Sequence, residues 1–146
     1  MRVLFLCTGN SCRSQMAEGW TRTLHAATIE AWSAGTEPRG LDPRAVRVMA
    51  EAGVDIAAQR SKATTELLDR SFDLVVTLCD EGAEACPFFP GATRVLHAGF
   101  PDPPRLARDA RSEEEALEPY RRVRDAIRDF AAGLPDQIRN SSARAE

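Results

Sequence analysis

A thiol, several small residues and an arginine follow one another near the start of the sequence, at a spacing that suits oxyanion chemistry. Residues 7–14 read Cys-Thr-Gly-Asn-Ser-Cys-Arg-Ser and pass from an apolar run directly into a segment with helical spacing. Backbone N–H groups of a tight loop at a helix N-terminus bind tetrahedral anions. We predict that Cys7 is the nucleophile beneath such an anion. The residues predicted to surround the anion are Thr8, Gly9, Asn10, Ser11, Cys12, Arg13 and Ser14.

The side chains of this loop have separate expected tasks. Gly9 and Asn10 tolerate left-handed backbone angles, which a loop with inward-pointing amides needs. The arginine can hold two anion oxygens at once, and together with the loop amides it should favour the thiolate of Cys7. Ser14 can donate a hydrogen bond to that thiolate. The Cys12 thiol is expected to be a buried bystander. The alternative is a plain strand-to-helix turn around a buried cysteine.

Two further motifs offer a proton donor and a pair of thiols. Asp102 lies in the run Pro-Asp-Pro-Pro, where a rigid loop can present a carboxyl group as a general acid; the alternative is an ordinary turn aspartate. Cys79 and Cys86 border a polar stretch rich in Asp, Glu, Gly and Ala. This composition predicts an exposed, mobile segment whose thiols are redox-active. The alternative is two ordinary core thiols.

Bulk properties exclude several classes of protein. The 146 residues fit one domain, and a net charge of −3 argues against binding nucleic acid or anionic membranes through bulk charge. The cysteine spacings, C-x4-C and C-x6-C, do not match a standard zinc pattern, and only His25 and His97 could add imidazole. We expect no metal and no cofactor. The first apolar run is too short for a signal peptide, and no segment approaches a membrane span, so a cytoplasmic location is expected.

The elements that must position these residues alternate between strand and helix. Such alternation predicts an α/β fold in which a parallel sheet is covered on both faces. Cys7 and Cys79 follow the first and third expected strands, so both should lie at the carboxyl edge of the sheet. We expect one domain over residues 1–134 and a polar tail over 135–146, frayed from residue 137. Strands are expected at 2–6, 29–32, 72–78 and 93–97, and helices at 13–27, 43–52, 62–69, in a short piece capped by Ser112, and from Pro119 to Ala132.

These motifs together resemble the thioredoxin-coupled arsenate reductases, which share the fold of low-molecular-weight tyrosine phosphatases. The resemblance extends from Arg2 to about Ala132 and implies a single domain with a four-stranded parallel sheet and helices on both of its faces. The matching segments are residues 7–19, residues 75–79 with Cys86 and Pro87, residues 99–103, and the helix over residues 120–127.

The resemblance also implies a reaction. Cys7 would attack arsenate, Arg13 and the loop amides would stabilise the thiol adduct, and Asp102 would protonate the departing oxygen. Cys79 would then attack Cys7, which releases arsenite, and Cys86 would attack Cys79 and pass the disulfide to a surface that thioredoxin can reach. Phosphate and sulfate would be competing anions, and the protein would act as a monomer.

Two other functions remain open at this point. A low-molecular-weight phosphotyrosine phosphatase needs Cys7, Arg13 and Asp102 but gives no task to the other two thiols. Such phosphatases tend to carry proline after the loop serine and an aromatic residue after Asp-Pro, where this sequence has Gln15 and Pro104. A non-enzymatic thiol sensor or metal-binding regulator would explain the cysteines but not the anion loop.

One departure from the family concerns a cation site. Some members bind potassium beside the loop through an asparagine, a glutamate, a serine and an aspartate. Asn10, Glu18 and Ser33 match the first three, but Lys62 aligns with the aspartate. An ammonium group tethered to the chain is therefore expected where other members hold the ion.

Overall fold

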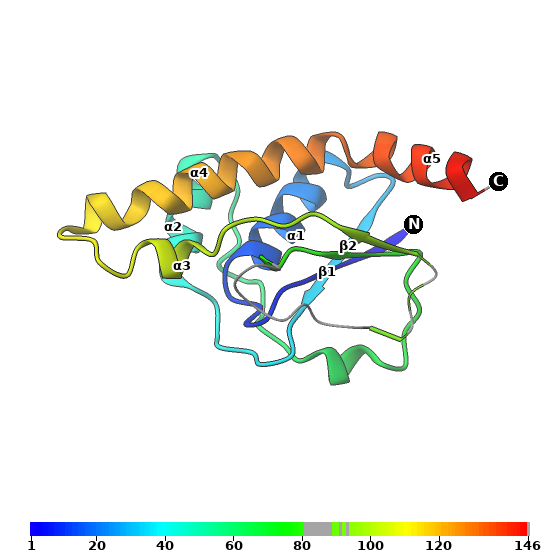
Figure 1. The fold of residues 1–146 in the computed structure, drawn as a ribbon, viewed down its shortest axis with the longest axis horizontal. Coiled ribbons are helices and arrows are strands. Elements are labelled where there is room, and N and C mark those ends of the chain that lie inside the picture. Colours follow the sequence, from blue (N-terminus) through cyan, green and yellow to red (C-terminus); the bar gives the residue numbers. More distant parts are fainter. Residues whose placement is uncertain (81–88, 91, 93, 146) are drawn as a thin grey trace.

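A four-stranded parallel sheet forms the centre of the molecule. The computed structural model describes residues 1–80, 89, 90, 92 and 94–145. The strand order is β2-β1-β3-β4 (Figure 1). β1, which precedes Cys7, and β3, which precedes Cys79, are therefore neighbours. This arrangement confirms the predicted single α/β domain with a parallel sheet. The strands are β1 (Arg2–Leu6), β2 (Glu30–Ala34), β3 (Leu74–Thr77) and β4 (Val95–His97).

The central strands are buried on both faces, which explains their uninterrupted apolar sequences. Val3, Leu4, Phe5 and Leu6 of β1 have no exposed surface. Alternate side chains of a strand point to opposite faces, so Val3 and Phe5 belong to one apolar cluster and Leu4 and Leu6 to the other. The short apolar run therefore correctly predicted a strand that is buried on both faces of the sheet.

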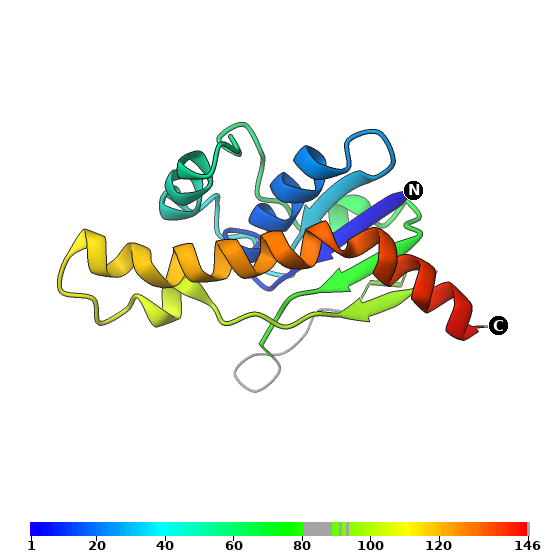
Figure 2. The same ribbon diagram turned by 90° about the horizontal axis from the view of Figure 1, so that it is seen from above.

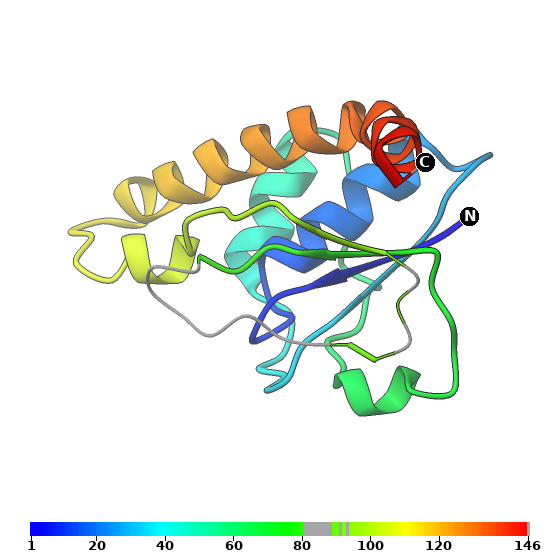
Figure 3. The ribbon, with the colours of Figure 1, turned by 45° about the vertical axis from the view of Figure 1, so that its right-hand side comes forward.

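Helices of unequal size cover the two faces. α1, α2 and α4 pack with Val3 and Phe5 in the larger cluster, and α4 crosses in front of the strands in Figure 2. The 3-10 helix η1 covers the opposite face, where Leu67 packs near Leu4 and Leu6 (Figure 3). The helices are α1 (Arg13–Leu24), α2 (Pro43–Glu51), η1 (Thr64–Leu67), α3 (Pro103–Leu106), α4 (Glu113–Ala132) and α5 (Leu134–Ala145).

The predicted break between a short helix near Ser112 and a last helix starting at Pro119 is wrong. Ser112 caps α4, since its side chain accepts a hydrogen bond from the Glu115 amide at 3.1 Å, and α4 then continues without interruption to Ala132. Pro119 lies inside this helix and is buried, as is its neighbour Tyr120. We attribute the continuity to this packing, which offsets the hydrogen bond that proline removes.

The predicted frayed tail is also wrong for the residues that the structure describes. α5 begins after Gly133 and extends to Ala145, because Leu134 is fully buried and Ile138 packs against the same core. α1 ends at Leu24 rather than at residue 27, and the imidazole of His25 lies 2.8 Å from the Ala131 carbonyl. The remaining boundaries differ from the predictions by a few residues. None of the helices that the described residues form is long and apolar enough to cross a membrane.

Candidate active site

The predicted anion loop lies between the end of β1 and the start of α1. Asn10 has φ 44°, a left-handed conformation, as the sequence predicted. Gly9 does not share it, because the glycines with positive φ among the described residues are Gly40 and Gly53. Gly9 instead leaves room for a neighbour, since a Cβ there would lie 3.2 Å from the Arg39 side chain.

Cys7, the predicted nucleophile, lies at the end of a chain of buried hydrogen bonds. The Asn10 side-chain amide donates to the Ser14 hydroxyl oxygen at 2.8 Å, and that oxygen lies 2.9 Å from the Cys7 sulfur. Because the Ser14 oxygen already accepts one bond, its own hydrogen can point at the sulfur. The geometry therefore allows the hydrogen bond that the sequence predicted from Ser14 to Cys7.

Two glutamines fix the left-handed Asn10, and sequence reasoning did not assign them this task. Gln15 is fully buried, and its amide nitrogen donates to the Asn10 carbonyl at 3.0 Å and to the Asn10 side-chain oxygen at 3.1 Å. Gln59 in turn donates to the Gln15 side-chain oxygen at 2.8 Å. The one signal in the sequence was that Gln15 stands where phosphatases tend to carry proline.

Gly35 lies directly against the backbone of the loop, and the sequence did not predict this close contact. A Cβ at this position would lie 2.5 Å from the Thr8 carbonyl oxygen and 2.8 Å from both the Cys7 carbonyl oxygen and the Asn10 nitrogen. These are backbone atoms, so they cannot move aside cheaply. The loop can therefore take its observed path only over a residue without a side chain.

The predicted arginine and acid come together beside the loop. Arg13 donates to the Phe100 carbonyl at 3.1 Å, and another of its guanidinium nitrogens lies 3.5 Å from the Asp102 carboxylate. The Arg13 side chain is only 4% exposed, whereas that of Asp102 is 29% exposed. The acid thus remains accessible to a ligand while the arginine is fixed.

An open cleft of about 680 Å³ contains this chemistry. Asn10 and Ser14 lie fully buried behind it and act through the hydrogen bonds described above. Of the residues predicted from the sequence, those that line the cleft are Cys7, Thr8, Gly9, Ser11, Cys12, Arg13 and Asp102. Among the described residues, no group of three or more His, Cys, Asp or Glu side chains is arranged to hold a metal ion.

The second thiol of the loop has a different environment from the first. Cys12 is free and 2% exposed. Burial raises the pKa of Cys12 well above its ordinary value, and the negative charges of Asp42 and Cys7 raise it further. The prediction of a buried Cys12 thiol is confirmed.

Cys79 lies at the sheet edge where the sequence placed it. Leu6 pairs with Thr77 across β1 and β3, and the Leu78 amide donates to the Leu6 carbonyl at 2.8 Å. Cys79 is disulfide-bonded and has no exposed surface. The expectation of an exposed thiol is therefore wrong for Cys79, because the sheet end and not the polar sequence that follows sets its burial. Cys86 lies outside the described residues.

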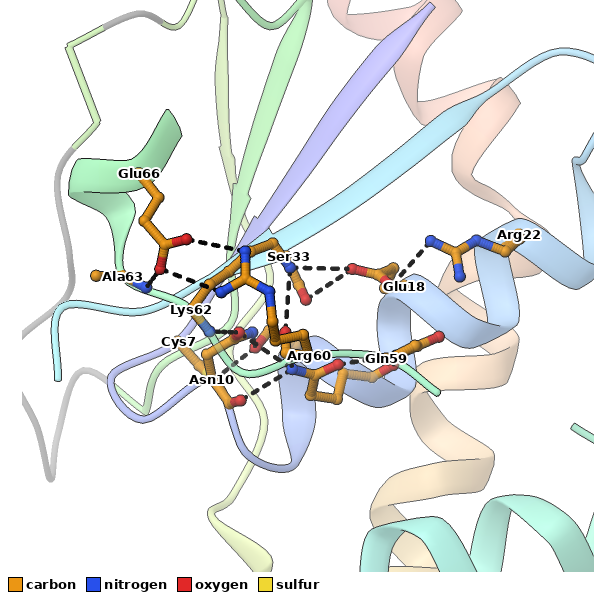
Figure 4. Close-up of polar contacts among 12 residues, drawn as sticks. Cys7, Asn10, Glu18, Arg22, Ser33, Gln59, Arg60, Lys62, Ala63 and Glu66 are labelled. Atoms are coloured by element: carbon orange, nitrogen blue, oxygen red, sulfur yellow. Dashed lines mark hydrogen bonds and ion pairs between the residues drawn. The ribbon is translucent and has the colours of Figure 1, made fainter. Parts of the chain in front are cut away.

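The residues aligned with the potassium site gather beside the loop (Figure 4). Ser33 donates to a Glu18 carboxylate oxygen at 2.8 Å, and the Lys62 ammonium lies 3.8 Å from the same oxygen. Arg22 contacts the other Glu18 oxygen at 2.9 Å. The Lys62 amide donates to the Asn10 side chain at 2.9 Å. Lys62 thus puts a tethered cation next to Glu18 and contacts the loop directly.

Comparisons with known proteins agree with this geometry. Residues 2–144 match the family described as low molecular weight phosphotyrosine protein phosphatase. An arsenate reductase of Halalkalibacterium halodurans is 46% identical over 125 residues, which are 86% of this chain and 88% of that protein. A solved arsenate reductase in the phosphate-binding state has a TM-score of 0.76 and 32% identity, covering 94% of this chain and 98% of that chain. A thioredoxin-dependent arsenate reductase of Corynebacterium glutamicum has a TM-score of 0.64 and 26% identity, covering 96% of this chain and 62% of that chain.

Proposed function

We propose that this chain, which belongs to the low molecular weight phosphotyrosine protein phosphatase family, is an arsenate reductase that uses Cys7, Cys79 and Cys86 in turn and is reduced by thioredoxin. One observation carries the proposal. A disulfide-bonded cysteine, Cys79, follows the strand directly beside the strand that carries the Cys7 loop. A phosphatase needs no such thiol, whereas a reductase needs one.

The first step is attack on arsenic. The Cys7 thiolate forms a sulfur–arsenic bond while an arsenic–oxygen bond breaks, and Asp102 gives its proton to the oxygen that leaves as water. The Ser14 hydroxyl at 2.9 Å stabilises the thiolate before attack. Arg13 is held by its bond to the Phe100 carbonyl and can neutralise charge on the remaining oxygens without reorienting.

The second step transfers the electrons. The Cys79 thiolate attacks the Cys7 sulfur, a disulfide forms, and the sulfur–arsenic bond breaks with its electron pair remaining on arsenic, which is thereby reduced from arsenate to arsenite. Cys86 then attacks Cys79 and restores the Cys7 thiol. The dithiol of thioredoxin finally reduces the Cys79–Cys86 disulfide, so each cycle consumes two electrons and two protons from thioredoxin and releases one water.

The burial of Cys79 supports a third cysteine. Thiol–disulfide exchange requires that the attacking thiolate reach a sulfur, and Cys79 has no exposed surface. A protein reductant needs a more accessible target, which is the task proposed for Cys86. The printed name of the Corynebacterium glutamicum relative supports thioredoxin as that reductant. We place the reaction in the cytoplasm, where Cys7 stays reduced between cycles, and propose a monomer.

The decisive experiment removes the last thiol. Cys86→Ser should release one arsenite per enzyme, stop with a Cys7–Cys79 disulfide that mass mapping identifies, and fail to turn over with thioredoxin. Cys79→Ser should release no arsenite under the same conditions. Full multiple turnover by Cys86→Ser with thioredoxin would refute the three-cysteine mechanism.

A further inference from the structure

The cleft around Cys7 is lined by carboxyl groups as well as by guanidinium groups. Glu37 and Asp42 contribute negative charge, Asp102 is the proposed proton donor, and Arg13 and Arg39 contribute positive charge. An anion that enters must therefore approach carboxylates as well as arginines. The carboxylates limit which anions the cleft can accept.

Asp42 is held rigidly, and its backbone contacts the anion loop. Its amide donates to the Ser11 carbonyl at 3.0 Å. One carboxylate oxygen accepts the Arg44 amide at 2.9 Å, which caps α2, and the other accepts the Tyr120 hydroxyl at 2.6 Å. In contrast, the Glu37 side chain is 72% exposed and can turn away from a ligand.

The Tyr120 hydroxyl acts as a permanent clamp. Tyr120 is 2% exposed and lies on α4, far from Asp42 in the sequence. Burial and the bond to Asp42 raise the pKa of Tyr120, so the hydroxyl keeps its proton and donates it. A carboxylate oxygen has two lone pairs, so each oxygen of Asp42 can still accept a bond from a ligand.

The Asp42 charge reaches the part of the loop where the anion would bind. Asp42 lines the same cleft as Cys7, and its amide is bonded to the Ser11 carbonyl of the loop. The carboxylate is thus a fixed negative charge at the side of the loop that is predicted to hold the anion, and it also raises the pKa of Cys12. A ligand oxygen that carries a proton can donate to it, and one without a proton is repelled.

We propose that Asp42, clamped by Tyr120, is a specificity-determining residue that admits protonated oxyanions and rejects fully ionised ones. Arsenate and phosphate keep at least one hydroxyl group at neutral pH, whereas sulfate keeps none. The site should therefore bind arsenate and phosphate in preference to sulfate. This inference rests on the anion-binding part of the proposed function and is independent of the thiol relay.

The test compares two inorganic anions on two matched variants. Calorimetric titration of the reduced wild-type protein should give tighter binding of inorganic phosphate than of sulfate. Asp42→Asn keeps the shape, the α2 cap and a partner for Tyr120, but removes the charge. It should tighten sulfate binding about tenfold, because it removes the repulsion between a carboxylate and an anion without a proton, and leave phosphate binding within about twofold. Glu37→Gln removes a mobile carboxylate from the same cleft and should change the ratio of the two affinities by less than about twofold.

Several results would overturn the proposal. One is a ratio of phosphate to sulfate affinity that does not change in Asp42→Asn, or a substitution that tightens both anions equally. Another is a change of this ratio in Glu37→Gln as large as that in Asp42→Asn. The last is a wild-type protein that does not prefer phosphate over sulfate. If Asp42→Asn does not fold, Tyr120→Phe decides, because it keeps the charge but releases the clamp. It should reduce the preference for phosphate at least about threefold, and an unchanged preference would count against the proposal. These titrations measure anion binding and not arsenate turnover. Failure of the thiol relay would therefore be distinguishable from failure of the proposed anion selectivity.

Discussion

Replacing Gly35 by alanine is the most direct perturbation of the anion loop that does not touch a reacting group. The added Cβ would lie 2.5 Å from the Thr8 carbonyl oxygen, whereas ordinary contact begins at 3.4 Å. The shortfall of about 0.9 Å falls on backbone, as do the two contacts at 2.8 Å with Cys7 and Asn10. The loop must therefore move by several tenths of an ångström or more.

The expected losses follow from that displacement. Active sites must hold their groups within about 0.5 Å, and a misplacement of about 1 Å can cost roughly 100-fold in rate. We therefore expect Gly35→Ala to lower kcat/KM for arsenate roughly 100-fold. The free energy of unfolding should fall by about 1–3 kcal/mol, the usual cost of overpacking. Phosphate affinity should fall in parallel, because the same loop amides bind it.

Gly19→Ala is the matched control. Its Cβ would lie 2.5 Å from the Cγ2 methyl group of Ile56, so a side chain and not the loop must yield. We expect a comparable loss of stability with kcat/KM within about threefold of wild type. Initial rates with arsenate give kcat/KM, titration calorimetry gives the phosphate affinity, and denaturant unfolding gives the free energy of unfolding. Wild-type phosphate affinity in a folded Gly35→Ala variant would refute the reasoning.

Three further outcomes can be measured. Cys7→Ser should abolish slow hydrolysis of a simple aryl phosphate and Cys79→Ser should retain it, because ester hydrolysis needs no second thiol; loss in a folded Cys79→Ser variant would contradict this division. Because Lys62 supplies a tethered cation, melting temperature should respond equally to sodium and potassium chloride at matched ionic strength, and a saturable effect of potassium alone would contradict that. The hydrogen bond from Arg121 lowers the pKa of Glu51 from 4.5 to about 2, so Glu51 stabilises the fold above pH 4.5 and loses this contribution as the pH falls toward 2. Glu51→Gln should therefore reduce the loss of stability between pH 4.5 and about 2. The reduction should be modest, since the Glu51 side chain is a third exposed. Acid unfolding curves of the same shape for the variant and the wild type would argue against this role of Glu51.

Local patterns predicted the parts of the site that neighbouring residues determine. The apolar run of β1 followed by a glycine and an asparagine predicted a strand that ends in a loop with a left-handed residue, and the structure contains both. The burial of Cys79 was not predictable in this way. The polar residues after it suggested exposure, but Leu78 before it is bonded to Leu6 of β1, and a Cβ on Gly99 would lie 3.1 Å from the Cys79 carbonyl.

The supports of the loop escaped prediction because they join distant segments. Gln15 and Gln59 are 44 positions apart, and Asp42 and Tyr120 are 78 apart. A glutamine or a tyrosine at such positions carries no periodic signal, and its partner is known only once the chain has folded. Gly35 is a similar case, because the sequence shows a glycine after a strand but not the loop backbone that lies above it.

The two thiols of the loop differ in the contacts that the fold gives them. Cys7 and Cys12 are both buried and both free, so burial alone does not distinguish them. The Ser14 hydroxyl, positioned by Asn10, lies 2.9 Å from the Cys7 sulfur. The charge of Asp42 instead acts on Cys12 and raises its pKa beyond the effect of burial. Since the thiolate and not the thiol is the nucleophile, a protonated Cys12 is a poor competitor in the proposed reaction, which leaves the Cys7 adduct to Cys79.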